Sequence, residues 1–205
     1  MSMLREVFGP SKKEIWKILS EKTGSAFVEG GLFCGSDKVV AQYRDWTITL
    51  DTYTVSDGKT SSTYTRMRTP YVNVDGFRFS VYRSGIFSGI GEFLGFHDTE
   101  IGYEEFDKAF VIKASNEDKV KELLSDTQIR ELINKQPRFH LEVKNDEGWF
   151  GTKFPDGVDE LYFRVPGVIK NIEQLEGLFE VFSEVMNRLC IIGAAYQSAP
   201  GVELK

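Results

Sequence analysis

Three segments alternate between apolar and polar residues, and this alternation constrains the fold more than any other feature. In residues 77–82, 138–143 and 160–165, large apolar side chains occupy every second position. Successive side chains of a β-strand point to opposite faces, so each segment predicts a strand with one buried and one solvated face. His140 then lies on the solvated face, as a surface histidine.

The first half of the chain is also predicted to form strands. Residues 26–33, 39–46, 47–55 and 60–69 are rich in β-branched and aromatic residues, which favour strands. The Asp57-Gly58 pair is typical of a tight hairpin between the last two segments. We therefore expect an antiparallel meander over this region.

Helices are predicted by capping residues that precede apolar residues spaced three and four apart. The pairs are Ser11 with Glu14, Ser115 with Asp118, Ser125 with Gln128, and Asn171 with Gln174. The apolar run from Phe106 to Ile112 favours a strand before the second of these helices. After Asn171 the apolar stripe is wide, which predicts a long terminal helix that a sheet or a partner covers.

Together these patterns predict an α+β fold, with antiparallel sheets that carry helices on one face and a long C-terminal helix. The chain is expected to be a single globular unit, or two sub-structures over residues 1–83 and 98–205. The glycine-rich segment 84–97 is the best candidate for a boundary between the two.

One block resembles a segment of bacterial protein families of unknown function. The resemblance rests on Gly102, Glu104, Glu105, Phe106, Asp107, Phe110, Val111, Asn116, Glu117, Asp118, Leu123, Leu124 and Leu132. It is centred on residues 102–133 and continues weakly towards the C-terminus. Some relatives carry transmembrane helices ahead of this domain, whereas this sequence has no such segment. The resemblance implies a fold and no established activity.

Composition excludes several classes of function. The formal net charge is −6, so the chain lacks the basic surface that nucleic-acid binding requires. Cys34 and Cys190 are too few and too far apart for a disulfide framework or a zinc site, and we expect two reduced thiols. The N-terminus has no secretory signal pattern and no stretch is long enough to span a membrane. These features indicate a soluble cytoplasmic protein.

The glycine-rich segment is the first candidate binding site. It combines flexible backbone, at Gly89 and Gly91 among others, with the large apolar side chains of Phe87, Phe93 and Phe96. One interpretation is a flap that contacts a partner, a ligand or, less favoured for a negatively charged chain, a membrane surface. The alternative is that the phenylalanines pack into the core while the glycines permit tight bends.

Acidic residues beside a histidine form a second candidate site. His97, Glu100 and Glu104 lie close in sequence, and such groups can bind a divalent cation or exchange protons. Their spacing matches no calcium-binding loop, and charged residues between strands are usually a solvated face. No cofactor is predicted.

The third candidate is the hairpin that contains Tyr64, Arg66 and Arg68. Tyrosine and arginine are common where proteins bind one another, so this hairpin can serve as a recognition edge. Alternating arginine and threonine can equally keep an exposed hairpin soluble.

The sequence thus favours a non-enzymatic binding or scaffolding module of a bacterial cytosol. Its partner is an unknown protein or a second copy of the chain. The alternative is an enzyme of unrecognised type that uses the acidic and histidine residues, with or without a metal. A concave site where polar groups converge favours the enzyme, whereas an exposed interaction surface favours the binding module.

Overall fold

The structure is a computed structural model that describes residues 10–31, 35–56, 58–85, 96–145, 153–202 and 204. In this part of the chain ten strands form one sheet: β1 (Ala26–Val28), β2 (Lys38–Tyr43), β3 (Trp46–Ser56), β4 (Ser61–Asn73), β5 (Phe79–Arg83), β6 (His97–Asp98), β7 (Phe110–Ala114), β8 (His140–Lys144), β9 (Val158–Pro166) and β10 (Ala195–Tyr196). Their order is β1-β2-β3-β4-β9-β8-β5-β7-β6, with β10 paired to β4. Neighbouring strands run antiparallel.

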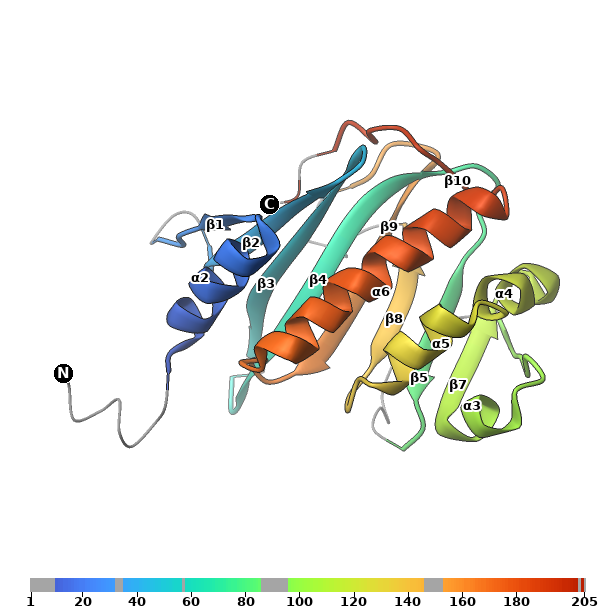
Figure 1. The fold of residues 1–205 in the computed structure, drawn as a ribbon, viewed down its shortest axis with the longest axis horizontal. Coiled ribbons are helices and arrows are strands. Elements are labelled where there is room, and N and C mark those ends of the chain that lie inside the picture. Colours follow the sequence, from blue (N-terminus) through green and yellow to red (C-terminus); the bar gives the residue numbers. More distant parts are fainter. Residues whose placement is uncertain are drawn as a thin grey trace.

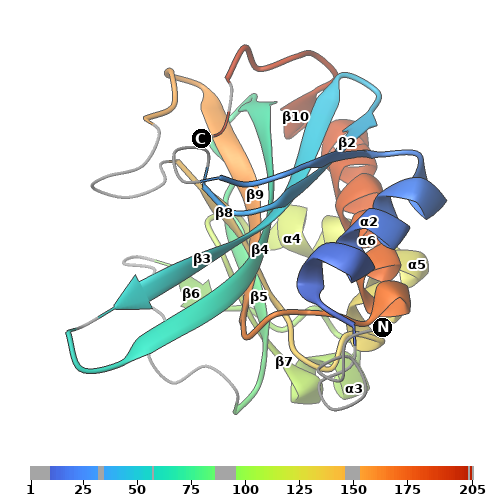
Figure 2. The same cartoon turned by 90° about the vertical axis from the view of Figure 1, so that its left-hand side faces the viewer.

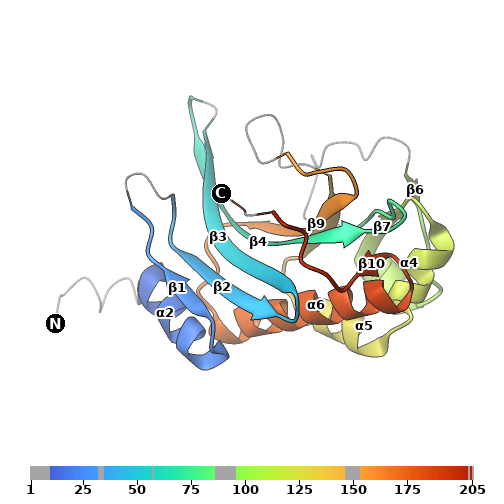
Figure 3. The same cartoon turned by 90° about the horizontal axis from the view of Figure 1, so that it is seen from above.

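Helices cover one face of this sheet. They are α2 (Lys12–Thr23), α3 (Glu104–Ala109), α4 (Glu117–Leu124), α5 (Thr127–Asn134) and α6 (Ile172–Ile191). The long α6 crosses the sheet diagonally, with α2 on one side of it and α4 and α5 on the other (Figure 1). Seen from above, α2, α5 and α6 lie together beneath the strands (Figure 3). The predicted α+β class and its long C-terminal helix are confirmed.

The apolar positions of the alternating segments face these helices. One row crosses six strands in register, and each of its members is almost completely buried: Leu50, Met67, Phe163, Leu141, Val81 and Ile112. Leu178, Phe182 and Leu189 of α6 belong to the same core cluster. Burying large apolar side chains is the main stabilising contribution, so the alternation predicted the helix-covered face correctly.

The sheet and the core draw residues from both sides of segment 84–97. Strand β4 pairs with β9 over eight residues, from Thr65 with Val165 to Val72 with Val158. The division into two sub-structures therefore stays a prediction, whereas the continuous sheet is observed.

Two of the four predicted caps are confirmed, and two are wrong by one residue. Ser11 and Glu14 form the expected capping box, and Asn171 accepts a hydrogen bond from the Gln174 amide. For α4 and α5, however, the caps are Asn116 and Asp126. In both cases an Asn or Asp follows the serine, and these side chains cap a helix at least as well.

The displaced serines have other contacts. Ser115 accepts a hydrogen bond from the Arg78 amide at 2.9 Å, which ties the end of β7 to β5. Ser125 donates its hydroxyl hydrogen to the carbonyl of Glu122 at 2.7 Å, and its own backbone is still helical.

The strand predicted from Phe106 begins only at Phe110, because residues 104–109 form α3. Asp107 accepts hydrogen bonds from the amides of Ile101 and Gly102 and so holds the turn before the helix. Phe106 stacks on Phe110 with ring centroids 4.5 Å apart. A spacing of four residues fits one turn of helix, which the apolar run alone did not reveal.

Candidate functional site

Polar side chains fill the sheet face that lies opposite the helices. We call this surface the polar face, and it comprises Thr49, Asp51, Tyr53, Tyr64, Arg66, Arg68, Ser80, Tyr82, Lys113, His140, Glu142, Lys144, Glu160, Tyr162 and Arg164. One row crosses six strands in register, from Thr49 through Arg68, Tyr162, Glu142 and Ser80 to Lys113. Each strand therefore contributes ionisable or hydroxyl groups to a common surface.

Much of the polar face is buried, which corrects a prediction from the sequence. His140 and Glu160 are 0% exposed, and Glu142 and Tyr162 are also buried. The interpretation of His140 as a surface histidine is therefore wrong. Alternation shows which side chains share a face, but it does not show whether that face is covered.

A buried ion-pair network lies where β3 meets β4. Asp51 accepts two hydrogen bonds from Arg66, at 2.6 and 3.0 Å, and one from Arg68 at 2.8 Å. Asp51 and Arg68 are both fully or almost fully buried. Arg68 therefore does not belong to an exposed recognition edge, because its guanidinium group is held inside the protein. Arg66 remains partly exposed.

The carboxyl group of Glu160 has an unusual environment beside this network. Neither of its oxygens has a hydrogen-bond partner among the described residues. Burial raises the pKa of Glu160 to about 7, although the positive charges of Arg68, Lys144 and Arg66 act in the opposite direction. Burial disfavours the charged form of an ionisable group, and this effect dominates here. Glu160 thus changes its protonation near neutral pH.

Two buried residues of β8, His140 and Glu142, are also affected by burial. Burial, together with the smaller effect of the positive charges of Arg164 and Lys144, lowers the pKa of His140 to about 3. Burial also raises the pKa of Glu142. His140 is therefore neutral at physiological pH, with its Nε2 3.7 Å from the Glu142 carboxylate. Glu142 can therefore hold a proton at a higher pH than an ordinary carboxyl group.

The exposed end of the polar face is a ribbon formed by β3 and β4. Tyr53 and Tyr64 stack with ring centroids 5.2 Å apart, and the Arg66 guanidinium lies 5.0 Å from the Tyr53 ring. The hydroxyl of Tyr162 donates to that of Tyr53 at 3.4 Å. Figures 2 and 3 show this ribbon projecting from the body of the sheet. The structure therefore brings together Tyr64 and Arg66, two of the residues predicted from the hairpin.

The structure describes only the two ends of the glycine-rich segment 84–97. Phe87, Gly89, Gly91 and Phe93 lie outside the described residues. Phe96 is described and is half-buried. A binding role for this segment stays a prediction.

The predicted acidic and histidine site is described only in part. His97 lies in β6, paired with Ala114 of β7, but its side chain is not described. Glu100 is exposed, and Glu104 pairs with Lys108 at 2.6 Å on the surface of α3. Within the described ranges no three His, Cys, Asp or Glu side chains are placed to hold a metal ion. The metal site stays a prediction.

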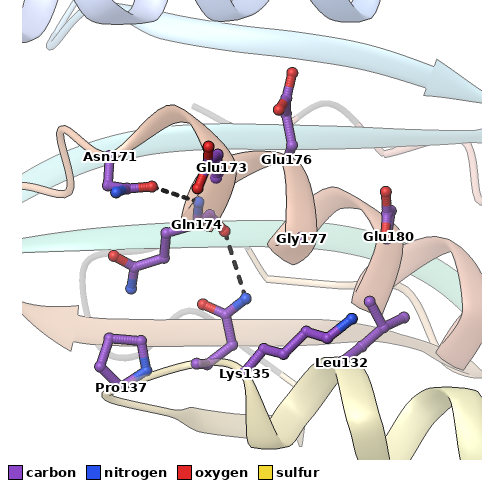
Figure 4. Close-up of a pocket in the computed structure, with 10 residues that line it drawn as sticks. Leu132, Lys135, Pro137, Asn171, Glu173, Gln174, Glu176, Gly177 and Glu180 are labelled. Carbon is purple, nitrogen blue, oxygen red and sulfur yellow. Dashed lines mark hydrogen bonds between the residues drawn. The ribbon is translucent and has the colours of Figure 1, made fainter.

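Sequence reasoning missed a groove beside the first turns of α6. Its cavity has a volume of about 510 Å³, and its walls carry Glu173, Glu176 and Glu180 (Figure 4). These residues are spaced three and four apart, so they form a stripe on one side of the helix. That spacing was visible in the sequence, but the opposite wall comes from residues 132–137, which only the fold brings near.

Comparisons with known proteins add information on the fold. No protein-family model matches the sequence, and no curated protein matches it. This result agrees with the predicted resemblance to families without an established function. Among solved structures, the mycobacterial trehalose monomycolate transport factor A, TtfA, is similar with a TM-score of 0.52 and 10% sequence identity. The match covers 87% of this chain and 94% of TtfA.

The likeness to TtfA therefore concerns the arrangement of the chain across nearly its whole length. In the part of the chain that the structure describes, no helix combines the length and the apolar character that crossing a membrane requires.

Proposed function

We propose that this protein is a non-enzymatic binding module of a bacterial cytosol, and that its binding element is the β3–β4 ribbon. The partner is a protein that contacts the edges of the ribbon and the Tyr53, Tyr64 and Arg66 side chains at its base. The observation that carries this proposal is the length of the ribbon beyond its neighbouring strands.

Both edges of the ribbon lack a neighbouring strand in the described structure. Strand β2 pairs with β3 only as far as Leu50, and the ladder between β9 and β4 ends at Thr65. Beyond these points β3 and β4 continue to pair with each other, up to Ser56 with Ser61. On the outer edge of β4, Gly167 still bridges Tyr64 and donates its amide hydrogen to the carbonyl oxygen of Thr63 at 2.8 Å, so that edge is open from Ser62 onwards. A two-stranded ribbon is marginally stable in water, and its open edges invite pairing with other chains. Such an extension therefore contributes little to stability, which favours a role in binding.

The side chains at the base of the ribbon support the same role. Aromatic residues and arginine dominate the binding energy of protein interfaces. The stacked tyrosines and Arg66 are already held by one another and by Asp51. Because these groups are ordered in advance, less conformational entropy is lost when a partner binds.

The similarity to TtfA is consistent with this proposal. TtfA is a transport factor by its name, and we extend to this chain the idea of an accessory protein that acts through binding. The free thiol of Cys190 fits the reducing cytosol in which we place the protein.

A shortened ribbon tests the proposal. Residues 54–63 are replaced by Asn-Gly, so that the cross-strand partners Tyr53 and Tyr64 flank a two-residue turn. Purified wild type and variant are used to capture proteins from extract of the source organism, which are identified by mass spectrometry. Sedimentation of each purified protein detects self-association.

We expect partners, or self-association, that the wild type shows and the shortened variant loses. Thermal unfolding of the variant establishes that the body of the sheet is intact. A matched control substitutes Ile191, an exposed residue at the end of α6, with serine. If the shortened variant retains the same partners and association state as the wild type, the ribbon is not the binding element and the proposal is overturned.

A further inference from the structure

A second site lies on the opposite side of the molecule from the polar face. It is the groove between α6 and the segment that leaves α5, and it is independent of the ribbon. The cavity volume of about 510 Å³ falls in the range of small-molecule sites. Figure 4 shows Glu173, Glu176 and Glu180 along α6, with Lys135 and Pro137 on the facing wall.

Two of the three glutamates have no ion-pair partner among the described residues. Glu176 is paired with Lys22 of α2 at 2.8 Å, which neutralises it. Glu173 and Glu180 are exposed, and both line the cavity. They are seven residues apart on one side of the helix, so their backbone positions are separated by about 10 Å along its axis.

The facing wall supplies a buried acceptor without a donor. Gln136 is 2% exposed and lines the cavity. Its Nε2 donates to the carbonyl oxygen of Gln174 at 3.4 Å, whereas its Oε1 has no hydrogen-bond partner among the described residues. Buried amide oxygens are normally hydrogen-bonded, so this atom points to a missing donor.

Gly177 allows Gln136 to reach this position. A Cβ atom at residue 177 would lie 3.0 Å from Nε2 of Gln136, which is closer than such contacts normally come. Glycine inside a helix is unfavourable for helix formation. At position 177 of α6 it leaves room for the side chain of Gln136 to approach closely.

We propose that the groove binds a linear organic polyamine whose terminal ammonium groups are about 10 Å apart. One terminus pairs with Glu173 and the other with Glu180, while the N–H groups between them donate towards the wall that holds Gln136. The net charge of −6 attracts a cation of this kind from a distance.

A single metal ion does not fit these carboxylates. Calcium and magnesium require oxygen ligands within about 2.0–2.6 Å of one centre, whereas Glu173 and Glu180 are two helical turns apart. A longer molecule with charges at both ends satisfies the spacing. Lys135 also lines the groove, and its positive charge opposes binding.

Isothermal titration calorimetry with spermidine at low ionic strength tests the proposal. We expect saturable binding to the wild type and at least tenfold weaker binding, about 1.4 kcal/mol, to the double variant Glu173→Gln, Glu180→Gln. Lys135→Gln removes the opposing charge and is expected to strengthen binding. Putrescine is too short to span two helical turns and should bind more weakly than 1,8-diaminooctane, which carries the same charge and is as long as spermidine.

The control makes the same change of net charge elsewhere. Glu21 and Glu122 are exposed residues outside the groove, and Glu21→Gln, Glu122→Gln is expected to bind spermidine as the wild type does. Equal weakening in both double variants, or equal binding of putrescine and 1,8-diaminooctane, would show attraction by net charge alone and would overturn the site. Circular dichroism of each variant establishes that the helices are retained.

Discussion

Replacing Glu160 with glutamine should stabilise the protein at neutral and alkaline pH. The carboxyl group is completely buried, has no hydrogen-bond partner among the described residues, and has its pKa raised by burial to about 7. In the unfolded chain the pKa returns to about 4.5. Between these two pH values the unfolded chain releases a proton that the folded protein retains, so the free energy of unfolding falls as pH rises.

The magnitude follows from the two pKa values. Their difference, at 1.36 kcal/mol for each pH unit, corresponds to about 3 kcal/mol. This loss is absent below pH 4.5, where both states are protonated, and is complete above pH 7. Glutamine has no charge at any pH, so Glu160→Gln should raise the free energy of unfolding at pH 8 by about 3 kcal/mol more than at pH 4.

Urea-induced unfolding of both proteins at pH 4, 5, 6, 7 and 8 measures this effect. His140 titrates in part of the same range, but it is present in both proteins and cancels in their difference. Glu21→Gln, a change at an exposed position of α2, serves as the control. A difference between wild type and Glu160→Gln that does not vary with pH would refute the reasoning, because it would show that Glu160 is solvated or paired when folded.

Three further predictions concern buried and capping groups. Asp51→Asn removes the charge that faces the buried Arg68. Urea unfolding at pH 7 should show that the free energy of unfolding falls by about 3–5 kcal/mol. A fall below 1 kcal/mol would contradict a stabilising role for the buried ion-pair network. Asp126→Ala should lower the free energy of unfolding by about 1 kcal/mol, whereas Ser125→Ala should change it little, because Asp126 caps α5; equal effects would contradict this assignment. Burial lowers the pKa of His140 to about 3, so as pH falls below 6.5 the unfolded chain binds a proton at this position before the folded protein does. Between pH 7 and pH 5 the free energy of unfolding of His140→Asn should therefore fall by about 2 kcal/mol less than that of the wild type. An equal fall in both proteins would disprove this prediction.

The fold was largely predictable because the apolar residues that become buried recur at regular spacings in the sequence. Apolar residues at every second position placed Phe163 and Leu141 on the helix-covered face, where they are buried. The same pattern is produced by a polar face that is open to water and by one that is covered. The burial of His140 and Glu160 therefore depends on tertiary structure, which periodicity does not encode.

The candidate sites were less predictable, because their residues come together only in the fold. Arg68 lies in the hairpin as expected, but its burial follows from its position between β3 and β9 in the middle of the sheet. The groove joins α6 to Gln136, which is 38 positions from Gln174. The cap at Asp126 was a local feature, and there the choice between neighbouring Ser and Asp was decided by where α5 begins.

The pairing of β4 with β9 has a consequence for synthesis of the chain on the ribosome. Thr65 pairs with Val165, so one edge of β4 stays unpaired until about a hundred further residues have been synthesised, which takes roughly 5–20 s at typical rates of elongation. During this interval the hairpin of β3 and β4 has emerged, while its inner edge and the apolar side chain of Met67 lack their final neighbours. Contacts so distant in sequence also slow folding. The nascent chain should therefore depend on chaperones most strongly after β4 is made and before β9 arrives.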